Sequence, residues 1–136
     1  MVTLKPAAEA AVVVCRTCKY AADNREGPDG RTGGAHLAEA LRQGRDRAGD
    51  DALAIEETDC LFACSRFCTV HLRAPGKVSY VLGGFEPTPA AADAILTFFR
   101  HYLDSDGGAV PFKLWPQGVK GRFITRQPPP GAVVER

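Results

Sequence analysis

The chain has 136 residues, of which 45% are apolar and 24% charged, and its formal net charge is +1. This length favours a single domain, and the small net charge argues against a partner that recognises global charge, such as a nucleic acid or an anionic membrane. The longest early apolar stretch, residues 10–14, is far too short to cross a membrane, and no signal-peptide pattern surrounds it. We therefore expect a cytoplasmic protein.

The first half of the chain predicts a strand, a helix and a second strand. A β-branched run over residues 10–15 is typical of a buried strand, and it ends at the first cysteine. After a turn-rich loop, helical spacing of apolar residues covers 35–48, with Gly49 as the stop signal. Residues 52–59 predict a second strand, which runs directly into Cys60.

The second half predicts a hairpin, a helix and an arm. Residues 69–73 alternate between polar and apolar, 74–77 have the Pro-Gly centre of a type II turn, and 78–82 form the return strand. Thr88 is a good N-cap for a helix whose core-facing stripe consists of Ile95, Phe98, Phe99, Tyr102 and Leu103. From residue 110 onward prolines are frequent and periodicity is weak, so we expect an irregular extended arm that Trp115 anchors to the domain.

These elements predict an α/β fold of thioredoxin-like order, β-α-β, cysteine loop, β-β-α, with a mixed sheet over residues 1–109 and an irregular C-terminal arm over 110–136. The first βαβ unit should make two parallel strands. Cys15 and Cys60 each follow one of these strands, and the carboxyl ends of parallel strands share one edge of the sheet. We therefore expect the two cysteine groups to meet in space.

Five cysteines occur in two groups, Cys15-Arg-Thr-Cys18 and Cys60-Leu-Phe-Ala-Cys64-Ser-Arg-Phe-Cys68. The odd number does not suit a disulfide framework, and clustered cytoplasmic thiols more often bind metal or do redox chemistry. Four thiolates hold an iron–sulfur cluster, and short spacings let two sulfurs from one loop reach the same cluster. Arg16, Lys19 and Arg66 lie beside the cysteines, where cations would offset the negative charge of such a cluster.

Several motifs resemble known families. The segment Val12-Val-Val-Cys-Arg-Thr-Cys18, the string Cys60-Leu-Phe-Ala-Cys64 and the hairpin over 69–82 resemble the thioredoxin-like [2Fe–2S] ferredoxins. A string similar to 60–64 also occurs in the thioredoxin-like subunit of NADH dehydrogenases. The longer cysteine string Cys60 to Val70, the Arg-Ala-Pro-Gly-Lys string at 73–77 and the Gly-Gly-Ala-Val-Pro string at 107–111 extend the similarity. Over roughly residues 10–130 the chain thus resembles a bacterial family described as predicted metal-binding protein.

The ferredoxin resemblance implies a [2Fe–2S] cluster with Cys15, Cys60 and Cys64 among its ligands. The chain departs from the family pattern, because the second ligand there normally lies just before the first helix, where this chain has no cysteine. The fourth ligand is therefore Cys18 or Cys68. We favour Cys18, because Cys68 opens a strand and its sulfur is expected to turn into the core as a small buried hydrophobe.

The sequence thus predicts an electron-transfer protein that docks with a redox reductase and an acceptor, and it contains no acid–base or nucleophile constellation that would indicate an enzyme. The alternatives are a zinc-binding module or metal carrier that uses the same cysteines, and a thiol–disulfide enzyme built on Cys15 and Cys18. A homodimer stays open. His36, His71 and His101 lack the pairing of a Rieske site and are expected to be surface or capping residues.

Overall fold

The computed structural model describes residues 2–21, 24–63 and 66–135. In this part of the chain five strands form one mixed sheet with the order β2-β1-β3-β4-β5. The strands are β1 (Ala11–Cys15), β2 (Ile55–Thr58), β3 (Val70–Arg73), β4 (Ser79–Leu82) and β5 (Phe123–Gln127). β1 and β2 are parallel, and the other neighbouring pairs are antiparallel. The predicted α/β class and the parallel first pair are confirmed.

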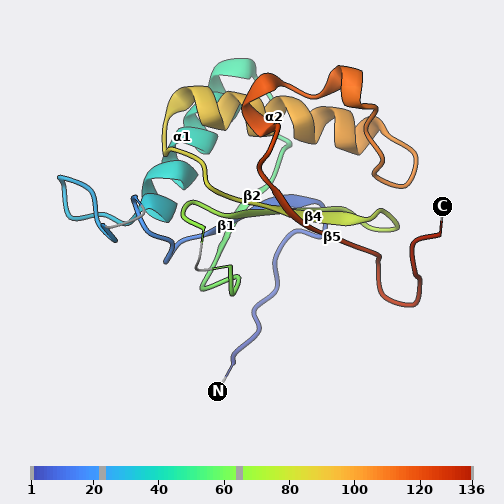
Figure 1. Cartoon of the computed structure of the whole chain (residues 1–136), viewed down its shortest axis with the longest axis horizontal. Coiled ribbons are helices and arrows are strands. Elements are labelled where there is room, and N and C mark those ends of the chain that lie inside the picture. Colours follow the sequence, from blue (N-terminus) through green and yellow to red (C-terminus); the bar gives the residue numbers. More distant parts are fainter. Residues whose placement is uncertain (1, 22–23, 64–65, 136) are drawn as a thin grey trace.

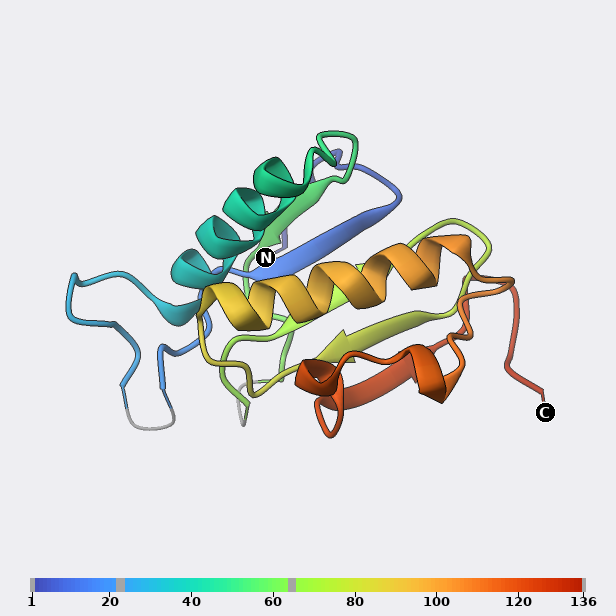
Figure 2. The same ribbon diagram turned by 90° about the horizontal axis from the view of Figure 1, so that it is seen from above.

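Two α-helices, α1 (Gly33–Ala48) and α2 (Pro89–Asp104), cover the same face of this sheet (Figure 1). α2 runs across the middle of the sheet, and α1 lies beside it above β1 and β2 (Figure 2). The N-terminal segment lies on the opposite side of the sheet from the helices (Figure 1). Both helices on one face and a mixed sheet are compatible with a thioredoxin-like α/β fold.

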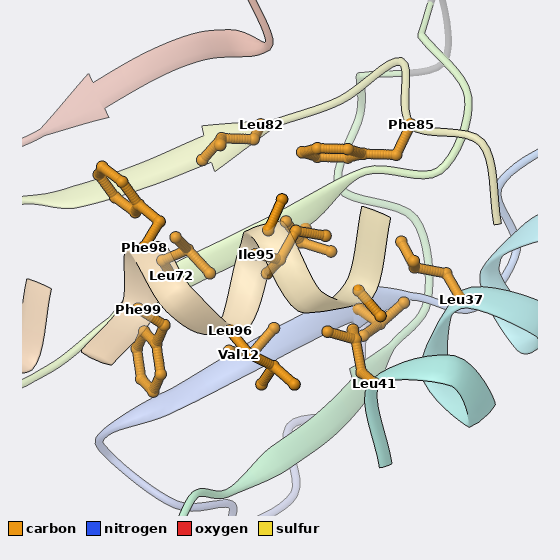
Figure 3. Close-up of a cluster of buried hydrophobic side chains, with 14 of the residues drawn as sticks. Val12, Leu37, Leu41, Leu72, Leu82, Phe85, Ile95, Leu96, Phe98 and Phe99 are labelled. Atoms are coloured by element: carbon orange, nitrogen blue, oxygen red, sulfur yellow. The ribbon is translucent and has the colours of Figure 1, made fainter. Parts of the chain in front are cut away.

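The core lies between the helices and the sheet, and Figure 3 shows part of it, including Ile95, Phe98 and Phe99 of α2. The predicted α2 stripe is buried at four of its positions, Ile95, Phe98, Phe99 and Tyr102, and half-buried at Leu103. α1 contributes Leu37 and Leu41, and the strands contribute Val12, Val14, Val70, Leu72 and Leu82. Successive residues of a strand point to opposite faces of the sheet. The residues of β1 and β3 that join this core therefore lie at every second position.

The helix boundaries follow from their caps. Thr32 accepts a hydrogen bond from the Ala35 amide at 3.1 Å, so α1 begins at Gly33, two residues before the predicted start. Gly49 ends α1 in the left-handed conformation at φ 74°, as predicted. Thr88 caps α2 as predicted, since its hydroxyl accepts from the Ala91 amide at 3.2 Å.

The C-terminal arm is more regular than the sequence predicts. It contains two short 3-10 helices, η1 (Phe112–Leu114) and η2 (Gln117–Val119), before β5 pairs with β4 and extends the sheet (Figure 2). The Trp115 ring lies 5.9 Å from the Phe98 ring of α2, centroid to centroid, and 4.6 Å from the Phe123 ring. The indole also donates to the Val110 carbonyl at 2.9 Å. Trp115 therefore anchors the arm, as predicted. Among the described residues, no helix has the length and apolarity that a membrane span requires.

Candidate functional site

The two cysteine groups meet at the carboxyl end of the parallel strands. Cys15, the last residue of β1, lies opposite Thr58, the last residue of β2, and Cys60 follows two residues later. A cavity of about 140 Å³ opens at this edge. Its lining consists of Cys15, Thr17, Cys18, Lys19, Arg25, Cys60, Leu61, Ala63 and Arg66. Three of the predicted site cysteines thus line one cavity, although more than forty residues separate the two groups in sequence.

The first cysteine loop is held by the neighbouring strand and by the start of α1. The Cys15 amide donates to the Thr69 carbonyl at 3.0 Å, and the Gly34 amide donates to the Cys18 carbonyl at 3.3 Å. The Thr32 hydroxyl, which caps α1, also donates to the Arg16 carbonyl at 2.6 Å. The N-terminus of α1 therefore fixes the position of the loop.

The second cysteine loop is linked to the first across the sheet edge. Arg16 forms an exposed ion pair with Asp59 at 2.5 Å, and these residues stand next to Cys15 and Cys60 respectively. The Phe62 amide donates to the sulfur of Cys60 at 3.2 Å, and Phe62 itself adopts a positive φ of 57°. Cys64, the fourth predicted ligand, lies outside the described residues.

The electrostatics of the first loop favour one thiolate. Hydrogen bonding from the Cys18 thiol is the largest effect that lowers the pKa of Cys15, to about 5; the Thr17 hydroxyl and the Leu61 amide add to it, and burial opposes it. The pKa of Cys18 is raised, first because its thiol donates to Cys15 and then by burial. The Cys18 sulfur also lies 2.9 Å from the Thr69 hydroxyl oxygen. Cys15 is therefore the more nucleophilic and metal-binding sulfur of the pair at neutral pH.

Cys68 is part of the core instead of the cavity. Its side chain is 0% exposed and packs among the buried apolar residues between helices and sheet. Burial raises the pKa of the Cys68 thiol to about 12. Its sulfur lies 3.6 Å from the Lys19 carbonyl, a weak hydrogen bond. The sequence-based expectation that this sulfur turns into the core agrees with its position.

The donor set suits a soft metal centre, because thiolates are the ligands that zinc and iron–sulfur clusters share. The cavity exceeds the volume of about 10–15 Å³ that a single bound water requires. Within the described ranges, which omit 64–65, no three Cys, His, Asp or Glu side chains come close enough to hold one metal ion together. The thiols of Cys15, Cys18 and Cys60 therefore line one cavity, but among the described residues no three ligands surround a single point.

The histidines do not take part in this cavity. His36 was expected at the surface but is half-buried, and its ring contacts Asp29 at 2.8 Å. His71 differs from the prediction: it is half-buried, its Nε2 is shielded from solvent without a described hydrogen-bond partner, and burial lowers its pKa. The reason is that the N-terminal segment covers this face of the sheet, where Arg73 donates to the Ala8 carbonyl at 2.8 Å.

Two residues of the site were not singled out from the sequence. Arg25 comes from the turn-rich loop after the first cysteine pair, and Thr69 contacts the Cys18 sulfur from the position before β3. Arg25 belongs to no motif, and Thr69 was expected only as the start of the hairpin; both reach the site through long-range packing. The position of Thr69 directly after Cys68 is the one feature of the sequence that could have indicated its role at the site.

The fold and this site define an α/β protein with a cysteine-lined cavity at the carboxyl end of two parallel strands. The chain belongs to the family described as "Protein of unknown function (DUF1636)", whose family model matches residues 12–129. The matched range includes both cysteine groups and extends through β5, so it includes most of the arm. No curated protein and no solved structure matches the chain.

Proposed function

We propose that this protein transfers electrons through one [2Fe–2S] cluster held by Cys15, Cys18, Cys60 and Cys64. The observation that carries the proposal is the shared cavity, in which thiols from two distant segments face one small space at the sheet edge. Iron–sulfur clusters with four cysteine ligands need such an arrangement, because two short cysteine motifs must approach the same centre.

The polar groups around the cavity support this assignment. The Leu61 amide donates to the sulfur of Cys15, and the Phe62 amide donates to that of Cys60. An oxidised cluster with four thiolates carries a charge of about −2, and hydrogen bonds to the sulfurs help to stabilise the extra electron of the reduced form. When bound, the cluster supplies one-electron redox chemistry, and this chain holds it, donates to its sulfur ligands and shields it on the core side.

Cys18 is a better fourth ligand than Cys68 because of where each sulfur lies. Cys18 lines the cavity and is in hydrogen-bond contact with Cys15. Cys68 is wholly buried in the core and does not line the cavity.

The test is the visible spectrum of anaerobically purified protein and of two matched variants. Wild type and Cys68→Ser should be red-brown, because sulfide-to-iron charge transfer absorbs visible light, whereas Cys18→Ser should lose most of the colour. Circular dichroism of each variant checks that it folds. Colour retained in Cys18→Ser but lost in a folded Cys68→Ser would overturn the ligand choice, and a colourless wild type would overturn the cluster.

Zinc is the second candidate, since a C-x2-C pair in thiol contact also suits a tetrahedral site. It would leave the protein colourless with about one zinc per chain. A third reading is a thiol–disulfide oxidoreductase, favoured by the low pKa of Cys15 beside Cys18. That reading predicts metal-free protein whose Cys15 and Cys18 form a reversible disulfide.

A further inference from the structure

Phe62 is the most exposed large apolar residue of the described chain, and it stands beside the cysteine cavity. Its side chain is 94% exposed, although burial of an aromatic ring is strongly favourable. Its backbone adopts the left-handed conformation at φ 57°, which residues other than glycine, asparagine and aspartate rarely adopt. The hydrogen bond from its amide to the Cys60 sulfur ties this backbone to the site.

The loop therefore holds the phenyl ring in solvent at a cost in both hydration and backbone conformation. Strained backbone of this kind concentrates at functional sites, where surrounding structure maintains it. Exposed aromatic residues are the side chains that most often anchor protein–protein contacts. The ring is thus placed to enter a partner next to the redox centre.

The charges around the cavity indicate the kind of partner. Lys19, Arg25 and Arg66 line the cavity, and none of the described lining residues is a carboxylate. In the described part of the chain, no carboxylate forms an ion pair with these three cations. Other arginines are mostly paired, as Arg31 is with Glu39 at 2.6 Å and Arg42 with Glu57 at 3.0 Å. The cavity rim is therefore a local excess of positive charge.

We infer that Phe62, Lys19, Arg25 and Arg66 form a docking surface for an acidic electron-donor protein. This inference rests on the proposed function, because the cluster is what the donor reduces. The three cations exceed the charge of about −2 on an oxidised cluster, so an acidic protein is attracted. One-electron reduction of a bound cluster by the donor would bring the cluster charge to about −3, which the three cations of this surface would just balance. The attraction for an acidic protein would then weaken, which would favour release of the oxidised donor.

The experiment follows reduction of the cluster in a stopped-flow spectrometer with two donors, reduced flavodoxin as an acidic protein and dithionite as a small reductant. With flavodoxin the second-order rate constant of wild type should fall as salt is added. Phe62→Ala should slow reduction by flavodoxin about tenfold, the loss typical of one interface aromatic. Reduction by dithionite should not change, which shows that the cluster itself is intact.

Phe112→Ala is the matched control, because Phe112 is also an exposed phenylalanine (63%) but belongs to η1 in the arm. It should react with flavodoxin at the wild-type rate. Lys19→Gln, Arg25→Gln and Arg66→Gln together should lower the rate and flatten its salt dependence.

The outcomes separate this inference from the proposed function. A colourless wild type would refute both. A coloured Phe62→Ala that reacts with flavodoxin as fast as wild type, or a wild-type rate that rises with salt, would refute the docking surface and leave the cluster assignment intact.

Discussion

Gly34 is the residue at which α1 meets the first cysteine loop, and its replacement by alanine tests how the site is built. A Cβ at this position would lie 1.9 Å from the carbonyl oxygen of Cys15 and 2.7 Å from the Cα of Arg16. Both are backbone atoms, so no side-chain rotation relieves the clash. The start of α1 and the end of β1 must separate if the alanine is to fit.

The size of the effect follows from overpacking. Extra methylenes in a packed region cost about 1–3 kcal/mol, and a clash with backbone belongs at the upper end of that range. Alanine favours the helix by up to about 1 kcal/mol relative to glycine. We therefore expect Gly34→Ala to lower the free energy of unfolding by about 2 kcal/mol, or the melting temperature by about 8 °C for a domain of this size.

Urea unfolding followed by circular dichroism measures this change, and Gly44→Ala in the same helix is the control. A Cβ at Gly44 would meet only side-chain atoms, the Asp93 carboxylate and a Leu96 methyl, each at 3.1 Å. These atoms can shift, so the control should stay within about 1 kcal/mol of wild type. An unfolding midpoint of Gly34→Ala equal to that of wild type would refute the reasoning.

Two further substitutions test the fold around the site. Burial lowers the pKa of His71 below its ordinary value of 6.5, so the unfolded chain binds more protons and the protein should lose stability as pH falls below about 6.5. His71→Gln should reduce this loss, measured as the difference between urea midpoints at about pH 7.5 and about pH 5. An equal difference in wild type and variant would contradict the prediction. Trp115→Ala should destabilise the protein by about 2 kcal/mol, because the indole packs on Phe98 and Phe123, whereas a change below about 0.5 kcal/mol would mean that the arm is not part of the folded domain.

The arrangement of the first βαβ unit can be predicted from the sequence, and so can the edge of the sheet at which the two cysteine groups meet. The β-branched run before Cys15 and the strand before Cys60 are local signals, and a single helix between two strands is typical of a parallel pair. Parallel strands put both carboxyl ends at one edge, so the convergence of the two cysteine groups follows from topology alone. The observed pairing of Cys15 with Thr58 has this cause.

Features that depend on long-range contacts do not follow from the sequence pattern. β5 is a short edge strand whose alternation is weak, and its pairing with β4 is stabilised by the aromatic contacts of Trp115 and Phe123. The burial of His71 depends on the N-terminal segment crossing the open face of the sheet. The positive φ of Phe62 could not be predicted, because the sequence usually indicates this conformation by a glycine and the residue here is phenylalanine.

The most direct measurement is the content of iron and acid-labile sulfide in protein purified without oxygen. The shared cavity and the four proposed cysteine ligands predict about two irons and about two sulfides per chain, with visible absorbance that decreases on reduction. Protein that contains neither iron nor sulfide, and that does not take them up when both are supplied under reducing conditions, would contradict the iron–sulfur assignment.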